Sequence, residues 1–277
     1  MIVTAMADYD IRPLQLKILE ILQAVDKTCK EHNLRYYLTA GTMLGAIRHK
    51  GFIPWDDDAD IAMPRPDYEL LIANAKQWLP TQYELICAEN DKNYSLPFAK
   101  IQDAETTIIE HSHLRYLGGV YMDVFPLDGL PDNKIVRYFH VRRYKKLRKK
   151  LYFTYRDPYR HGHGPACWLP LLHRKLYTVE GLQQKIRELL LKYSYDESKM
   201  VQDYDDGHNG AFRKEILGTP TPYIFENVEL KGYENYDAYL SQKYGDYMTP
   251  PDGKHQIQHN FYYLDLEHPY REYHGEK

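Results

Sequence analysis

The sequence predicts an α+β fold, with a mixed β-sheet and flanking helices in its first half and a mostly helical region after it. Three observations predict this. Apolar residues recur at helical spacing over residues 12–32, several short apolar runs of strand length follow up to residue 125, and the composition changes after Pro131. We therefore divide the chain into a core, 1–132, and a helical and loop-rich region, 133–277, packed on that core.

The first element is a helix over residues 12–32. Its apolar side is made by Leu14, Ile18, Ile21, Leu22, Val25 and Cys29. Asn33 suits its C-terminal end, because Asn tolerates the left-handed conformation found there. Residues 34–38 then predict a short strand.

A strand-to-helix turn is predicted at Thr39–Arg48. Gly41 allows a tight backbone in this turn, and Thr42 can cap the helix that follows. After a loop, Asp58–Met63 predicts a second strand, and Pro66 suits the first turn of a helix that ends near residue 79.

The remaining elements alternate less regularly. Strands are predicted at Tyr83–Ala88, Pro97–Gln102, Thr106–His111 and Gly119–Phe125. Residues 134–150 contain nine Lys or Arg and no Asp or Glu, which predicts a basic helix, and residues 178–193 predict another helix. Beyond these the chain is rich in Tyr, Gly, Pro and Asp, so we expect short helices and loops.

Composition narrows the function classes. The 277 residues carry 36 Lys or Arg and 39 Asp or Glu, a net charge of −3 that does not favour a dedicated nucleic-acid binder. The three cysteines form no CxxC pair, which is typical of a reducing compartment. The N-terminus does not resemble a signal peptide, and no apolar stretch approaches the roughly 20 residues of a membrane span. We therefore expect a cytoplasmic protein.

Acidic residues give the most specific signal for function. Asp58 and Asp60 are two apart in a predicted strand, so their side chains would share one face, with Cα atoms roughly 6.5–7 Å apart. Two such carboxylates repel each other unless a cation lies between them, and oxygen ligands suit Mg²⁺ or Mn²⁺. Asp123, between apolar neighbours in a later strand, is a third candidate ligand. The alternative is a solvated acidic loop.

This combination resembles the polymerase-beta type of nucleotidyltransferase, in which a Gly-Ser/Thr turn holds donor phosphates and three acids hold divalent metal. The longer strings 40–61 and 121–129, with the connecting block 98–103, resemble the LicD/fukutin family. The resemblance runs from about residue 34 to 130, and beyond it only 244–251 is similar. Ala59 and Met122 replace larger or branched apolar residues that are usual in the family.

The resemblance implies transfer of phosphocholine, or a related phospho-substituent, from CDP-choline or another CDP-linked donor. The acceptor would be a sugar hydroxyl of a cell-surface glycan, a teichoic acid or lipopolysaccharide precursor, either free or lipid-linked. Asp58, Asp60 and Asp123 would bind the metal, and Asp123 would complete the coordination, act as the base, or both. Gly41 and Thr42 would contact donor phosphate at a helix N-terminus.

Two cations are further candidates for phosphate contacts. Lys100 lies in mid-strand among apolar residues, which favours a function, whereas Arg48 is equally well explained as a surface helix residue. The basic run 134–150 predicts contact with an anionic acceptor or with the inner membrane surface, or else a solvated face. The segment 161–167, with His161, His163 and Cys167, is a weaker candidate for a soft-metal site, against a flexible glycine-rich loop, and His255 and His259 are weaker candidates for the active-site rim.

Two other functions share these residues. One is a nucleotidyltransferase that adds a nucleoside monophosphate to a protein or small molecule, and it would need the same acids. The other is a catalytically inactive nucleotide-binding module, which the intact acids at all three positions argue against.

Overall fold

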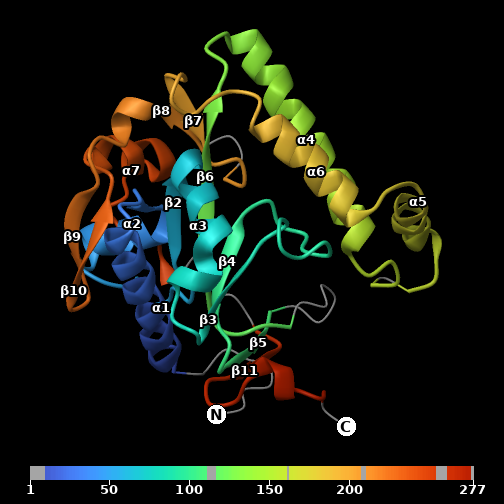
Figure 1. The fold of residues 1–277 in the computed structure, drawn as a ribbon, viewed down its shortest axis with the longest axis horizontal. Helices are drawn as coiled ribbons and strands as arrows, with labels where there is room; N and C mark the ends of the chain where they lie inside the picture. Colours follow the sequence, from blue (N-terminus) through green and yellow to red (C-terminus); the bar gives the residue numbers. More distant parts are fainter. Residues whose placement is uncertain (1–9, 111–116, 161, 207–209, 254–260, 276–277) are drawn as a thin grey trace.

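A computed structural model of the chain describes residues 10–110, 117–160, 162–206, 210–253 and 261–275 (Figure 1). It confirms the predicted α+β class, with a mixed sheet flanked by helices. Helices α4 and α6 extend from one side of the sheet as an arm, and α5 lies at the far end of that arm (Figure 1).

The helices are α1 (Arg12–Glu31), α2 (Ala40–Arg48), α3 (Arg65–Trp78), α4 (Lys134–Tyr155), α5 (Trp168–Leu176), α6 (Val179–Leu190) and α7 (Tyr236–Tyr244). The strands are β1 (Tyr37–Leu38), β2 (Asp60–Pro64), β3 (Tyr83–Ile86), β4 (Ala99–Asp103), β5 (Thr107–Ile109), β6 (Tyr121–Leu130), β7 (Met200–Gln202), β8 (Ala211–Arg213), β9 (Thr221–Phe225), β10 (Val228–Gly232) and β11 (Tyr263–Asp265). Short 3-10 turns lie at Pro165–Cys167, Lys214–Ile216 and Tyr270–Glu272.

The main sheet has the order β3-β4-β6-β2-β1-β10-β9, and β7 and β8 continue from the end of β6. The central pair, β2 and β6, is parallel, whereas β4 is antiparallel to β6 and β1 is antiparallel to β2. Helices α1 and α3 pack on this sheet. The predicted apolar side of α1 is buried, and Asn33 has the expected positive φ of 53°.

Several predicted strands are shorter than expected or pair elsewhere. The first consists only of Tyr37–Leu38, and the second begins at Asp60 rather than Asp58. The run 106–111 gives β5, which pairs with β11 in a separate two-stranded sheet, and His111 lies outside the described residues. Residues 200–232 contribute strands to the main sheet that their Tyr-, Gly- and Pro-rich composition did not predict.

The arm has an apolar core of its own. Leu151 of α4 belongs to one buried apolar cluster with the α6 side chains Leu182, Ile186 and Leu190. Asn133 caps α4 by accepting hydrogen bonds from two backbone N–H groups, and Thr178 caps α6 by accepting one from Gly181. Among the described residues, no helix is both long and apolar enough to cross a bilayer.

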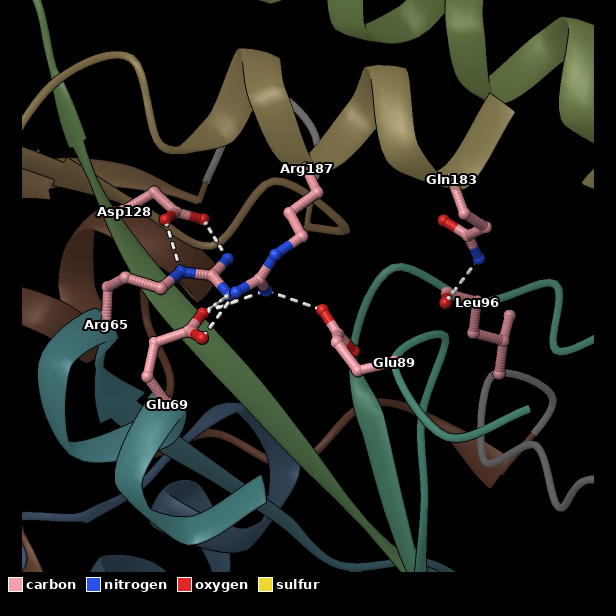
Figure 2. Close-up of polar contacts among 7 residues, drawn as sticks. All are labelled: Arg65, Glu69, Glu89, Leu96, Asp128, Gln183 and Arg187. Atoms are coloured by element: carbon pink, nitrogen blue, oxygen red, sulfur yellow. Dashed lines mark hydrogen bonds and ion pairs between the residues drawn. The ribbon is translucent and has the colours of Figure 1, made fainter. Parts of the chain in front are cut away.

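An ionic cluster fastens the arm to the sheet (Figure 2). Arg65 donates two hydrogen bonds of 2.7 Å to Asp128 of β6. Arg187 of α6 donates to both carboxylate oxygens of Glu69, at 2.9 and 2.5 Å, and to Glu89 at 2.5 Å. The charges of α3, β6 and α6 thereby neutralise one another where the arm begins.

Candidate active site

Three of the predicted site residues lie side by side in the centre of the sheet. Asp60 of β2 is the register partner of Asp123 on β6, and Asp123 is the register partner of Lys100 on β4. Side chains at paired positions of adjacent strands lie on the same face of a sheet. The fold therefore brings residues 60, 100 and 123 into one row.

Asp58 joins this row in a different way from the one predicted. Because β2 begins at Asp60, Asp58 lies in the preceding loop, and the argument that alternation along a strand aligns these two acids was wrong. Asp58 nevertheless raises the pKa of both Asp60 and Asp123, so its carboxylate is close enough to repel both. Loop geometry, rather than strand alternation, directs it to the site.

The loop also forms an acidic cluster of its own. Carboxylate oxygens of Asp56, Asp57 and Asp58 lie within 4.8 Å of one another. This distance is compatible with three oxygen ligands around one hard cation. Asp58 is common to this cluster and to the predicted set of Asp58, Asp60 and Asp123, so the two sets overlap at one residue.

Burial and crowding raise the pKa values of the row. Burial is the largest cause of the raised pKa of Asp60, followed by repulsion from Asp58 and Asp123. Burial likewise raises the pKa of Asp123 to about 7, against the opposing effect of Lys100. Carboxylates that are costly to ionise together are stabilised by a bound cation, so the donor chemistry fits Mg²⁺ or Mn²⁺.

The turn before α2 contacts both acidic groups. Helix α2 begins at Ala40, which places Thr42 in its first turn and makes Thr39 the N-cap residue, contrary to the predicted cap. The Thr42 hydroxyl instead accepts a hydrogen bond of 2.8 Å from the Asp60 backbone N–H. The positive φ of this turn, 46°, falls on Ala40 rather than on Gly41.

Gly41 is required for a close approach. A Cβ atom at this position would lie 2.8 Å from Oδ2 of Asp56, closer than carbon and oxygen tolerate. The absence of a side chain therefore lets the N-terminus of α2 lie directly against the acidic loop. A phosphate bound between them would meet a helix N-terminus on one side.

Lys100 and Arg48 occupy very different positions. The buried Lys100 ammonium lies 3.1 Å from Asp123 Oδ1, 3.7 Å from Glu110 Oε1 and 3.1 Å from the centre of the Tyr121 ring. Arg48 donates to the Tyr247 carbonyl at 2.8 Å from the last turn of α2, about 10 Å along the helix axis from Gly41. The structure thus places Lys100 in the row and Arg48 against the C-terminal segment.

The second half of the chain adds residues that the sequence did not single out. The Thr39 hydroxyl lies 2.7 Å from the Tyr239 hydroxyl and accepts a hydrogen bond of 2.9 Å from Tyr233. The Ala40 backbone N–H donates to Tyr239 at 3.1 Å. The abundance of tyrosine was visible in the sequence, but nothing there indicated which hydroxyl groups would hold this turn.

Asp203 is a further acid near the site. It follows β7, burial raises its pKa to about 7, and its charge contributes to the raised pKa of Asp60. Lys243 of α7 forms an ion pair with the neighbouring Asp206. The three aspartates at 203–206 could have indicated this acid from the sequence, but the whole region is rich in Asp, so they did not stand out.

The weaker histidine candidates gain no support. His161, His255 and His259 lie outside the described residues. His163 is exposed beside Tyr159, with ring centres 4.4 Å apart. In the part of the chain that the structure describes, the only group of three or more potential ligands within 4.8 Å is the acidic one at 56–58.

Comparison with known proteins relates this site to a known domain family. A profile of the LicD/FKTN/FKRP nucleotidyltransferase domain matches residues 33–154. The chain is 27% identical over 255 residues to the lipopolysaccharide cholinephosphotransferase LicD of Haemophilus influenzae, covering 90% of this chain and 96% of that protein. Uncharacterised proteins of Rickettsia prowazekii and Rickettsia typhi are each 36% identical over 52 residues, 19% of this chain. Residues 33–154 are thus similar to the nucleotidyltransferase domain of LicD, FKTN and FKRP, and the similarity to LicD extends over most of the chain.

Proposed function

We propose that this protein moves phosphocholine, or a related phospho-substituent, from a CDP-linked donor to a sugar hydroxyl of a cell-surface glycan. The row of Asp60, Asp123 and Lys100, with Asp58 beside it, carries this proposal. The name of the Haemophilus influenzae relative, which aligns over 90% of this chain, supports choline as the substituent and lipopolysaccharide as the acceptor.

Asp58 and Asp60 are assigned to a divalent cation, Mg²⁺ or Mn²⁺. Once bound, such an ion neutralises the phosphate oxygens of the donor and the charge of the departing nucleoside monophosphate. Asp123 either completes the coordination or removes the proton from the acceptor hydroxyl. A pKa raised to about 7 suits the second role, because a base works best near the working pH.

The neighbouring residues position these groups. Thr42 fixes the start of β2 through the Asp60 N–H group, and Gly41 brings a helix N-terminus to the donor phosphates. Lys100 balances the charge of Asp123 and is within reach of a phosphate oxygen held in the same row. Arg48, at the other end of α2, is the predicted phosphate contact that the geometry supports least.

The first test is donor turnover. The purified chain is incubated with Mg²⁺ and CDP-choline, CDP-ethanolamine, CDP-ribitol or CDP-glycerol, with and without crude surface glycan, while CMP release is measured. Glycan-dependent release from CDP-choline supports phosphocholine transfer, and release from another CDP donor keeps the mechanism and changes the substituent. Absence of CMP from all four donors contradicts the proposal.

A metal-binding measurement distinguishes the two overlapping ligand sets, the acidic loop at 56–58 and the predicted set of Asp58, Asp60 and Asp123. Mn²⁺ affinity, measured by electron paramagnetic resonance, is compared between Asp57→Asn and Asp60→Asn. A loss confined to Asp60→Asn assigns the ion to the row, and a loss confined to Asp57→Asn assigns it to the loop. Unchanged affinity in both variants would remove the metal from this site.

A nucleotidyltransferase reaction is the second candidate, because the matching profile describes a nucleotidyltransferase domain. In that case a nucleoside triphosphate would yield pyrophosphate and leave a nucleoside monophosphate on the acceptor. Pyrophosphate release from a triphosphate, together with inactivity towards every CDP donor, would favour this reaction.

A further inference from the structure

Helix α5 turns its apolar side away from the rest of the protein. Trp168, Leu172 and Leu176 are 67%, 50% and 59% exposed, and Leu169 and Leu171 are also exposed. At 100° per residue these five side chains fall within an arc of about 160°. An ordinary surface helix has the reverse arrangement, with its apolar stripe facing the core.

The opposite side of α5 is the one that holds the helix in place. The Arg174 guanidinium donates hydrogen bonds of 3.0, 3.1 and 2.9 Å to the backbone carbonyls of Thr154, Tyr155 and Arg156. These groups lie at the C-terminal end of α4, where carbonyls lack partners within the helix. Pro170 is buried on the same side. The outward direction of the apolar arc is therefore set by specific contacts of the inner side.

The surrounding arm is strongly cationic. Residues 134–177, from the start of α4 to just past α5, hold 13 of the 36 Lys and Arg of the chain and only one of its 39 Asp and Glu. This segment carries a net charge of +12 in a chain whose total is −3. Four of the cations, Lys134, Arg137, Arg142 and Lys145, line one groove along the first half of α4, at the end of the arm next to β7 and β8. Such a surface attracts anionic partners over a distance of about 8–10 Å at physiological ionic strength.

We propose that α5 is an interfacial helix that docks the arm on an anionic lipid surface. Trp168 and the neighbouring leucines would lie among the lipid headgroups and upper acyl chains, while the cations of the arm face the headgroup charge. The helix has nine residues, about 14 Å, so it lies on a bilayer rather than crossing it. This inference extends the membrane contact predicted from the basic run and is independent of the transferase activity.

Lipid fits this surface better than the other anionic partners. A polyanionic glycan or a nucleic acid would satisfy the cations but would leave five apolar side chains in water. A second copy of the chain would cover the apolar arc only by bringing two arms of like charge together. Trp is typical of side chains placed at a membrane interface, because its ring is apolar and its indole N–H is polar.

The experiment uses the full chain and flotation with phosphatidylcholine vesicles, with or without phosphatidylglycerol. The test variant is Leu172→Ser combined with Leu176→Ser, and the matched control is Leu70→Ser, which changes a similarly exposed leucine on α3 of the core. We expect binding to the anionic vesicles, a partition coefficient at least about tenfold lower in the test variant, and no change in the control. Circular dichroism and the melting temperature establish that both variants fold.

A second measurement follows Trp168 directly. Its fluorescence should shift to the blue on anionic vesicles and be quenched by brominated lipid. The Trp168→Phe variant keeps the other two tryptophans of the chain and should show neither the shift nor the quenching. Lys146→Glu combined with Lys149→Glu should weaken binding at low salt. The proposal would be overturned if the leucine variant bound vesicles as well as the wild type, or if the wild type bound neutral and anionic vesicles equally. It would also be overturned if the wild type formed a dimer that the leucine variant disrupts and neither protein bound lipid.

Discussion

Two aspartates on strand β6 show how the same residue type acquires opposite roles. Asp128 receives two hydrogen bonds of 2.7 Å from Arg65, and that pair continues into the cluster that fastens the arm (Figure 2). Asp123, five residues earlier, has one cation at 3.1 Å and is repelled by Asp58 and Glu110. Burial raises the pKa of both carboxyls, but only one of them has a dedicated guanidinium partner.

The difference teaches that burial alone does not mark a functional acid. Both aspartates follow apolar residues in the sequence, and both lie in the block that resembles the family. What separates them is the charge of residues brought from elsewhere: Arg65 on α3 for Asp128, and Asp58 and Asp60 for Asp123. Asp123 is surrounded by more negative than positive charge, whereas the charge of Asp128 is balanced by Arg65. Substitutions in the row of Asp123 should therefore affect activity, and substitution of Asp128 should affect stability.

The largest effect is expected at the row. Asp60→Asn should lower CMP release at least about 1,000-fold, because a neutral amide is a poor ligand for a divalent cation. Its melting temperature without metal should stay the same or rise, since the substitution removes a like charge from a buried group. Turnover assays and thermal melts on one preparation measure both. A variant that keeps wild-type turnover would remove Asp60 from the site.

The matched change at the other aspartate should act on stability. Asp128→Ala leaves the buried Arg65 with only its longer contact to Glu69, and breaking a buried ion pair in this way typically costs about 3–5 kcal/mol. Urea denaturation of the two proteins measures the loss. If Asp128→Ala is as stable as the wild type, the cluster does not hold the fold together, and the comparison with Asp123 fails.

The sequence predicted much of the fold because local signals agreed with the tertiary structure. Helix α1 and its buried stripe, the proline at the start of α3 and the basic helix α4 all follow from residue spacing and capping. The alternation argument for Asp58 failed because the strand begins two residues later. Strand periodicity cannot show where a loop gives way to pairing, since that depends on the partner strand.

For the candidate site, the sequence predicted which residues take part better than it predicted how they are arranged. Asp60, Asp123 and Lys100 were all named from the sequence, and the register joins them. The roles of Thr42, Tyr239 and Asp203 were not predictable, because each acts through a residue far away in the chain. A residue that holds another in place leaves no local pattern.

Lys100 offers a sharper test of how charge sets the role of Asp123. Lys100→Met should reduce turnover about 100-fold, at the lower end of the range typical of general acid–base catalysis. It should also raise the pKa of Asp123 further above 7, because the cation that opposes burial is gone. If Asp123 is the base, the pH at which activity rises must then move upward. A uniform loss at every pH would instead assign Lys100 to donor phosphate.

A smaller effect is expected where the arm meets the sheet. Arg187→Ala removes the partly exposed contacts to Glu69 and Glu89, which should cost about 1 kcal/mol. Hydrogen exchange should rise mainly in α6 and leave β2 and β6 protected. Equal loosening of the sheet would show that the arm and the sheet unfold together rather than as separate units.

The last effect concerns the pH dependence of stability, which has opposite signs in the two regions. Burial against Tyr193 and Tyr204 lowers the pKa of His140 in the arm to about 4, from 6.5. The folded arm therefore binds fewer protons than the unfolded chain, so its stability is complete above pH 6.5 and falls as the pH drops towards 4. The raised pKa of Asp123 works the other way, since its contribution is lost as the pH rises through about 7.

The two signs can be separated by comparing His140→Gln with the wild type between pH 7.5 and 4.5. The variant cannot bind the extra proton when it unfolds, so the free energy of unfolding should fall less steeply with acidification than in the wild type. Its absolute stability reflects altered packing as well, and only the difference in slope is diagnostic. Parallel slopes would mean that His140 is solvated in the folded arm, and the contrast between an acid-sensitive arm and an acid-tolerant sheet would then rest on Asp123 alone.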